Sequence, residues 1–119
     1  KNPKYLINES VDFVKKNYRR YNFHIVSGSD QKELRFLIKE LGLNKYFLSV
    51  FGSPKHKNDL VSDLIICNKY NRNDVCLIGD SINDLEAAKF NNITFFGYNN
   101  PKLKNLASYI TKLSQDFFE

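Results

Sequence analysis

Two carboxylates four residues apart follow a short apolar run. Residues 77–84 read Leu-Ile-Gly-Asp-Ser-Ile-Asn-Asp, so Asp80 and Asp84 come just after residues 75–78, which have the composition of a buried parallel strand. Ligands bind at the carboxyl ends of strands in open α/β sheets. Carboxylate oxygens suit Mg²⁺, which typically takes one or two of them and completes its shell with water and phosphate oxygens. The spacing predicts a magnesium site.

A simpler interpretation of the same residues needs no ligand. Asp80 would cap the following helix, and Asp84 would be a solvated acid in the first turn of that helix. The octapeptide alone leaves both interpretations open.

Polar residues also follow two earlier apolar strands. The strand at 23–26 leads into Ser27, Gly28 and Ser29, and a second strand at about 47–51 leads into Gly-Ser-Pro and a lysine-rich turn. A Ser-Gly turn before a helix offers an anion a hydroxyl and free backbone N–H groups, although ordinary turn and cap chemistry explains it equally well.

Lys57 is expected to open the helix that contains Leu60 and Val61. A cation there faces the positive end of the helix dipole, so an anion is expected nearby. Lys57 could neutralise a phosphoryl oxygen and a neighbouring carboxylate. Lys55 is the alternative residue for this role. The simpler interpretation of Lys57 is a solvated surface lysine with no ligand.

Other polar residues carry less information. His24, within a strand, is expected to be a packed or interfacial histidine. His56 lies beside the lysines and could touch a substrate, although a solvated histidine is the simpler interpretation. Tyr98 and Asn99 follow the fourth strand and could border the site.

Strands alternate with helices along the chain, which predicts parallel pairing and a three-layer α/β fold. Asp30 and Glu33 have the spacing of a capping box at the start of a helix. Gly42 is expected to end that helix. The strands are expected at residues 23–26, 47–51, 75–79, 93–96 and 109–111. The helices are expected at residues 5–20, 30–41, 57–65, 85–90, 103–106 and 113–118, with a loop at 97–101.

Composition favours a single soluble domain over residues 1–119, because 42% of the residues are hydrophobic and 26% are charged. No apolar run is long enough to span a membrane and no signal segment is present, so we expect a cytoplasmic protein with no membrane partner.

Cys67 and Cys76 are not expected to form a disulfide. The net charge of +5 is spread along the chain, which favours small anionic substrates and argues against nucleic acid. The chain starts with Lys and has no Met, which suggests a piece of a longer protein.

Three segments together resemble a known family. Residues 25–29 (Ile-Val-Ser-Gly-Ser), 51–57 (Phe-Gly-Ser-Pro-Lys-His-Lys) and 77–88 (Leu-Ile-Gly-Asp-Ser-Ile-Asn-Asp-Leu-Glu-Ala-Ala) resemble, in order and spacing, the second, third and fourth motifs of the haloacid dehalogenase-like (HAD) hydrolases. The similarity covers about residues 5–112. The last motif is similar to the phosphoglycolate phosphatase-like and sugar phosphatase-like branches. The resemblance implies a Rossmann-like fold with a mostly parallel sheet flanked by helices.

The resemblance also implies roles for particular residues. Ser27 and Gly28 would bind the phosphoryl group of a small phosphorylated metabolite, and Lys57 would be the catalytic lysine that steadies it. Asp80 would ligate Mg²⁺ directly, and Asp84 would bind or orient the water shell of the metal. The family reaction is phosphoryl transfer to an aspartate nucleophile, followed by hydrolysis of the aspartyl phosphate.

The first motif of the family is absent. Its Asp-x-Asp pattern ends a first strand, whereas Asp12 lies in a predicted helix. The cap that selects the substrate is absent too. Resembling proteins place the first strand between the strands that end at Ser27 and Asp80, and each unpaired buried backbone group there would cost about 1–3 kcal/mol. We therefore expect this chain alone to be inactive.

The missing strand could come from an N-terminal segment or a second chain, which we favour, from direct pairing of the flanking strands, or from strand exchange in a dimer. A different function is also possible for such a sequence. It could be a non-catalytic, degenerate domain that binds a phosphorylated ligand or partner, or, less well supported, a basic nucleic-acid-binding domain. Paired aspartates encoded upstream would favour the enzyme.

Overall fold

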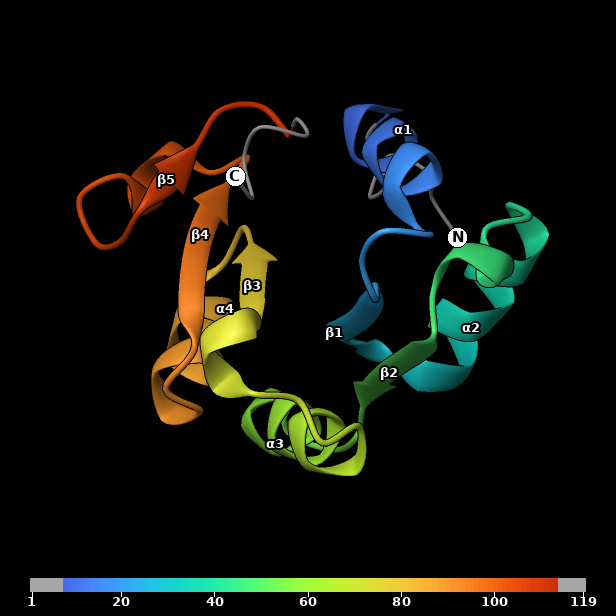
Figure 1. The fold of residues 1–119 in the computed structure, drawn as a ribbon, viewed down its shortest axis with the longest axis horizontal. Coiled ribbons are helices and arrows are strands. Elements are labelled where there is room, and N and C mark those ends of the chain that lie inside the picture. Colours follow the sequence, from blue (N-terminus) through green and yellow to red (C-terminus); the bar gives the residue numbers. More distant parts are fainter. Residues whose placement is uncertain (1–7, 114–119) are drawn as a thin grey trace. The chain divides into compact units, whose positions relative to one another are not determined.

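The computed structural model describes residues 8–113, in which helices and parallel strands alternate (Figure 1). The α-helices are α1 (Asn8–Asn17), α2 (Gln31–Glu40), α3 (Lys57–Cys67) and α4 (Ile82–Phe90). The strands are β1 (His24–Asp30), β2 (Ser49–Ser53), β3 (Cys76–Gly79), β4 (Thr94–Tyr98) and β5 (Tyr109–Ile110). Short 3₁₀ helices are η2 (Asn44–Tyr46), η3 (Arg72–Asp74) and η4 (Pro101–Leu103).

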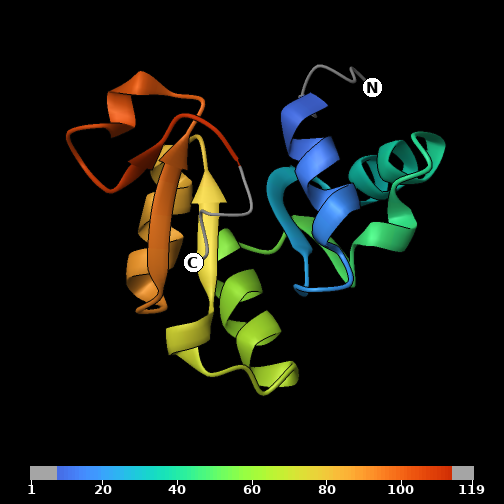
Figure 2. The ribbon, with the colours of Figure 1, turned by 45° about the horizontal axis from the view of Figure 1, so that its top comes forward.

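The strands form two parallel sheets, one of order β1-β2 and one of order β3-β4-β5. Helix α2 packs on β1 and β2, while α4 packs on β3 and β4 and also contacts α3 (Figure 2). Among the described strands, β1 and β3 each have one strand neighbour. The predicted α/β class, with parallel strands flanked by helices, is confirmed.

The chain divides into two compact units, each described by itself. The first comprises Lys1–Pro54 and Lys112–Glu119, and the second comprises Lys55–Thr111. Within the described residues, no helix is both long enough and apolar enough to cross a membrane.

Both helices of the first unit contribute buried apolar side chains. Phe13 of α1 is buried, and its ring meets that of Phe23 edge to face, with centroids 5.9 Å apart. Helix α2 begins where the Asp30 carboxylate accepts from the Glu33 N–H over 3.1 Å. It ends before Gly42, whose φ of +69° is the left-handed conformation that glycine adopts most easily, as the sequence predicted.

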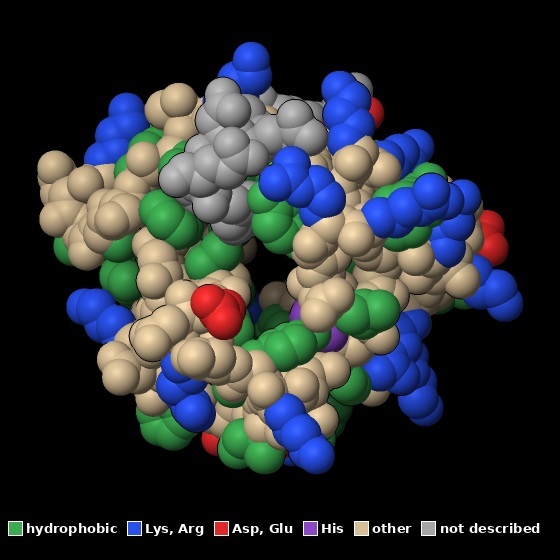
Figure 3. Space-filling view, in the orientation of Figure 1, with side chains coloured by type: hydrophobic (Ala, Val, Ile, Leu, Met, Phe, Trp, Pro, Cys, Tyr) green, Lys and Arg blue, Asp and Glu red, His purple; other side chains and the backbone are tan. Residues whose placement is uncertain are grey.

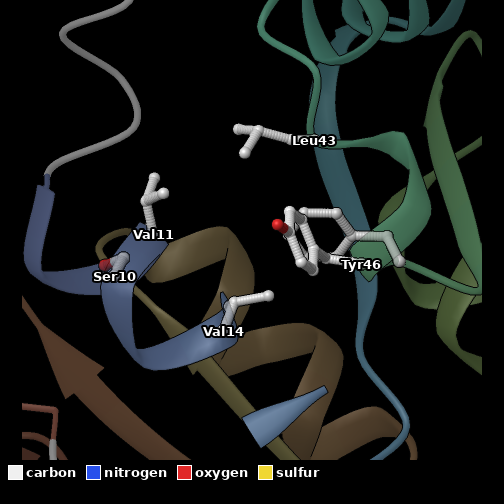
Figure 4. A pocket seen from close by; sticks show the side chains of 6 residues that line it. Ser10, Val11, Val14, Leu43 and Tyr46 are labelled. Carbon is white, nitrogen blue, oxygen red and sulfur yellow. The ribbon is translucent and has the colours of Figure 1, made fainter. Parts of the chain in front are cut away.

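A small pocket lies between α1 and the segment after α2, where Val11 and Val14 face Leu43 and Tyr46 (Figure 4). It is lined by Ser10, Val11, Val14, Leu43, Tyr46 and Phe47. None of these side chains is charged, so the pocket is not a candidate for phosphate or metal binding.

The second unit has its core between α4 and the sheet. The core side chains are Leu85, Ala88, Phe95 and Leu103. Ala87 and Ala88 are fully or almost fully buried on α4, and their small size lets this helix approach the strands closely.

Some predicted boundaries were wrong. Strand β1 continues beyond Val26 to Asp30, and β2 begins two residues later than expected. Gly97 and Tyr98 were predicted to be loop but belong to β4, because they pair with Tyr109 and Ile110 of β5. The helix predicted at 103–106 is instead the 3₁₀ helix Pro101–Leu103. The one predicted at 113–118 lies outside the described residues except for Leu113, which is not helical.

Candidate active site

Lys57 is the first residue of α3, and its side chain meets an acid. The His56 ring, through Nδ1, accepts from the Asn58 N–H over 3.1 Å and so caps this helix, a role that the sequence analysis missed. The Lys57 ammonium donates to Asp84 Oδ1 over 2.6 Å, and the two side chains are only 14% and 9% exposed. The anion expected beside Lys57 is therefore a carboxylate of the chain itself.

The second carboxylate oxygen of Asp84 is held by Ser81. Asp84 Oδ2 accepts from the Ser81 N–H over 3.2 Å and from the Ser81 hydroxyl over 3.0 Å, while the Asp84 N–H donates to Ser81 Oγ. This reciprocal pattern is a capping box at the start of α4. The simpler interpretation of the octapeptide is thus wrong, because Asp84 is buried and the cap is Ser81, not Asp80.

Gly79, the last residue of β3, leaves room for Asp84. A Cβ atom on Gly79 would lie 2.3 Å from Asp84 Oδ2 and 2.5 Å from Asp84 Cβ. Only glycine fits this position without moving the carboxylate. The glycine in the motif is therefore explained by packing of the acid four residues beyond Asp80.

Asp80 differs from Asp84 in its surroundings. It is exposed, directly beyond the carboxyl end of β3, and its side chain has no protein partner among residues 8–113. Its backbone carbonyl accepts from Asn100 Nδ2 over 2.8 Å. Asp80 is thus the acid left available to a ligand.

The residues after β4 contribute differently from what the sequence suggested. Asn100, which the sequence analysis did not single out, contacts the Asp80 backbone and also caps η4 by accepting from the Lys102 N–H. Its place before Pro101 is a local cap signal that could have drawn attention to it. Tyr98 is buried in β4, and Asn99 is exposed.

Lys55 is occupied elsewhere. It forms an exposed ion pair with Asp63 of α3, and hydrogen bonding to Asp63 raises the pKa of Lys55. Of the two candidate lysines, only Lys57 lies next to Asp84.

Ser27 and Gly28 belong to the first unit. Val26 is paired with Phe51 but Asp30 with Ser53, so β1 advances four residues while β2 advances two. Ser27 Oγ accepts from the Ser29 N–H over 3.1 Å, and Gly28 is exposed. The Ser-Gly segment thus forms an irregularity in the sheet, a feature often found beside functional sites.

Gly52 allows the backbone of that irregularity to come close. A Cβ on Gly52 would lie 2.3 Å from the Ser29 carbonyl oxygen. The Gly52 N–H donates to Gln31 Oε1 over 3.2 Å. Ser29 of the second motif and Gly52 of the third therefore lie against one another within this unit.

The His24 side chain is half-buried in the β1-β2 sheet, in agreement with the predicted packed histidine. Its Nδ1 lies 2.6 Å from the Ser49 hydroxyl, directly across the β1-β2 ladder. Burial lowers the pKa of His24, which favours the neutral ring. The cysteines Cys67 and Cys76 are free, as predicted.

The arrangement of the acidic side chains limits the kind of metal site that residues 8–113 could form. No group of three or more His, Cys, Asp or Glu side chains within residues 8–113 could hold a metal ion. Mg²⁺ at a phosphate site needs only one or two carboxylates, with water and phosphate oxygens completing its shell. The unpartnered carboxylate of Asp80 fits that kind of site, and Asp84 lies four residues further along, in the first turn of α4.

The charge on the visible face is dispersed. Lys and Arg side chains lie on both units rather than over one element (Figure 3). This pattern is consistent with the scattered basic residues of the sequence.

Comparison with known proteins identifies the family. The haloacid dehalogenase-like hydrolase family matches residues 4–98, which is more than half of the chain. The chain therefore belongs to the haloacid dehalogenase-like hydrolases. No curated protein matches it.

Solved structures share its fold. A protein from Lactobacillus delbrueckii subsp. bulgaricus proposed to be a phosphoglycolate phosphatase has a TM-score of 0.79 at 20% identity, with 95% of this chain and 52% of that one covered. A haloacid dehalogenase-like hydrolase from Streptococcus pneumoniae has a TM-score of 0.77 at 19% identity, covering 87% and 54%. A HAD-superfamily hydrolase from Ehrlichia chaffeensis has a TM-score of 0.76 at 20% identity, covering 93% and 55%. The chain thus spans about half the length of each of these proteins.

Proposed function

We propose that the complete protein is a magnesium-dependent phosphatase that acts on a small phosphate ester. The observation that carries the proposal is the buried Lys57–Asp84 pair, which lies in the same unit as the exposed and unpartnered carboxylate of Asp80. A fixed cation and a free carboxylate at the carboxyl end of a parallel strand suit phosphate and metal binding.

Each residue of the second unit has a distinct role in this proposal. Lys57 offsets negative charge on the phosphoryl oxygens, and Asp84 orients Lys57 through Oδ1. Asp80 holds Mg²⁺, which when bound neutralises further phosphoryl charge. Because Oδ1 and Oδ2 of Asp84 already accept from Lys57 and Ser81, we assign Asp84 to orientation of the metal's water shell rather than to direct ligation.

Ser27 and Gly28 are proposed to bind phosphoryl oxygens. Support comes from their exposed or half-exposed position in the irregular part of β1 and from the order of the family motifs. The aspartate nucleophile of the family would come from a segment outside these residues. Cytoplasmic location and the absence of nucleic-acid or membrane partners stay predictions of the sequence.

The experiment is hydrolysis of p-nitrophenyl phosphate by the full-length protein, with and without Mg²⁺. We expect Asp80→Asn and Lys57→Met to lower kcat/KM at least about 100-fold, the scale on which loss of one charge-stabilising group acts. Asp63→Asn and Lys55→Met are matched controls, since they remove the exposed ion pair, and we expect near wild-type rates. Equal rates for wild type and Asp80→Asn would reject the proposal.

We further propose that another segment or a second chain completes the sheet, so that the 119-residue chain alone is inactive. The apolar residues Ile25 and Val26 of β1 and Leu77 and Ile78 of β3 are only half-buried, although parallel strands are usually covered. Strands β1 and β3 each have only one neighbour among the described strands. Both features favour a missing partner strand.

This second proposal is tested by comparing the 119-residue chain with the full-length protein. We expect no turnover by the short chain, and faster hydrogen exchange of the β3 amides that face away from β4. Magnesium-dependent hydrolysis by the short chain would contradict the proposal.

A further inference from the structure

Asn91 forms a buried hydrogen-bonded centre between α3 and α4. It is the residue that ends α4, and it is only 3% exposed. Its Nδ2 donates to the Ala87 carbonyl over 2.9 Å and to the Asn58 carbonyl over 3.0 Å. These two acceptors use both amide hydrogens and leave Oδ1 facing the Ser62 hydroxyl, which donates to it.

Capping of α4 explains only part of this arrangement. A C-terminal Asn that bonds the Ala87 carbonyl needs no contact with another helix. The bonds to Asn58 and Ser62 instead attach Asn91 to the first turns of α3. Asn58 directly follows Lys57, so the backbone beside Lys57 is fixed from α4.

The backbone of Asn91 adds a third connection. Its carbonyl accepts from Arg72 Nε over 2.9 Å, and Arg72 lies in η3, which leads into β3. Asn91 therefore contacts the elements that carry or precede Lys57, Asp80 and Asp84.

We propose that Asn91 is a positioning residue for Lys57, an inference that rests on the proposed phosphatase function. The fully buried side chains of α3 are all apolar, and apolar contacts do not fix the axial position of a helix as directional hydrogen bonds do. Asn91 sets the first turn of α3 relative to α4, and the Lys57 ammonium then reaches both Asp84 and the phosphoryl group. Without Asn91, α3 keeps its apolar packing and the Lys57–Asp84 pair, but the Asn58 carbonyl no longer holds the first turn of α3 to α4, so the Lys57 ammonium is positioned less firmly.

The test uses the full-length protein with Asn91→Ala, and with Ile65→Ala as the matched control. Ile65 is buried in α3, and its truncation destabilises the helix packing without removing a hydrogen bond. At a temperature where circular dichroism shows both variants folded, we expect Asn91→Ala to lower kcat about 10- to 100-fold while KM changes little, the range that misplacement of a reacting group produces. Ile65→Ala should keep kcat.

A second measurement does not depend on activity. In selectively labelled protein, the Lys57 Nζ–H signal should be visible by NMR, because a buried, hydrogen-bonded ammonium exchanges slowly with water. We expect it in wild type and Ile65→Ala and not in Asn91→Ala. If the wild type hydrolyses no phosphate ester, the proposed function fails, and this signal alone decides the role of Asn91.

The outcomes that contradict the inference are specific. Asn91→Ala with unchanged kcat and an unchanged Lys57 signal would show that Asn91 only caps α4. Should Asn91→Ala not fold, Ser62→Ala removes one bond of the same centre, and the same two measurements apply. A wild-type kcat and Lys57 signal in Ser62→Ala would then reject the inference.

Discussion

Lys57 and Asp84, from the first turns of two different helices, form a buried ion pair with Nζ and Oδ1 2.6 Å apart. A lysine at a helix N-terminus is unfavourable toward the dipole of its own helix, whereas an aspartate in a first turn is favourable. Asp84 therefore both completes the capping box of α4 and compensates the charge of Lys57. A substitution at either residue should change how much the other contributes to the free energy of unfolding.

Lys57→Met is expected to lower the free energy of unfolding by roughly 3–5 kcal/mol, because it leaves the Asp84 carboxylate buried without its cation. The double variant Lys57→Met/Asp84→Asn should be more stable than Lys57→Met, since the Asn side chain can still accept from Ser81. Urea unfolding of the wild type, both single variants and the double variant gives the coupling energy. Strictly additive effects would show that the pair does not interact.

Gly79→Ala is expected to destabilise the protein by about 1–3 kcal/mol, because its Cβ would overlap the Asp84 carboxylate. The matched control is Gly28→Ala, where a Cβ meets nothing within 4 Å. That variant should be neutral or up to about 1 kcal/mol more stable. Thermal unfolding of the two variants side by side checks this, and equal stability would contradict the packing explanation for Gly79.

The parts of the fold that the sequence predicted well depend on local signals. The cap at Asp30, the left-handed Gly42 and the start of α3 at Lys57 are determined by a few neighbouring residues. The need for an anion near Lys57 also followed from local reasoning, because a helix dipole acts within one turn. These predictions did not require knowledge of distant contacts.

The parts that were missed depend on contacts between distant residues. Strand β4 extends over Gly97 because that residue pairs with Tyr109. Asn100 meets the Asp80 carbonyl across 20 positions of sequence, and Asn91 meets the Asn58 carbonyl across 33. An asparagine in isolation reads as turn or cap chemistry, so a single sequence gives no sign of such partners.

Acidification should destabilise the protein through His24. Burial makes the folded-state pKa of His24 lower than its ordinary value of 6.5. Between the folded and unfolded pKa values the unfolded chain binds more protons, so stability falls as the pH decreases below 6.5 and is unaffected by this group well above it. Urea unfolding at pH 7.5 and 5.5 measures the loss.

The variant His24→Gln isolates this contribution, because Gln retains a polar side chain opposite Ser49 but does not titrate. We expect its stability to depend less on pH than that of the wild type over the same interval. An identical pH dependence in the two proteins would assign the loss to other groups.

The two thiols should differ in reactivity. Cys67 is exposed, whereas burial raises the pKa of Cys76 in β3 to about 11. At pH 8 only about one Cys76 side chain in a thousand is then the reactive thiolate. Iodoacetamide treatment followed by peptide mass spectrometry should show rapid alkylation of Cys67 and slow alkylation of Cys76.

Two further measurements distinguish the effect of the raised pKa of Cys76 from steric blocking of its thiol. Raising the pH from 8 to 10 should accelerate Cys76 alkylation in the folded protein, because the thiolate fraction increases about tenfold per pH unit below the pKa. Unfolding in urea at pH 8 should bring the two rates together. Rapid alkylation of Cys76 in the folded protein at pH 8 would show that β3 is less covered than the structure indicates.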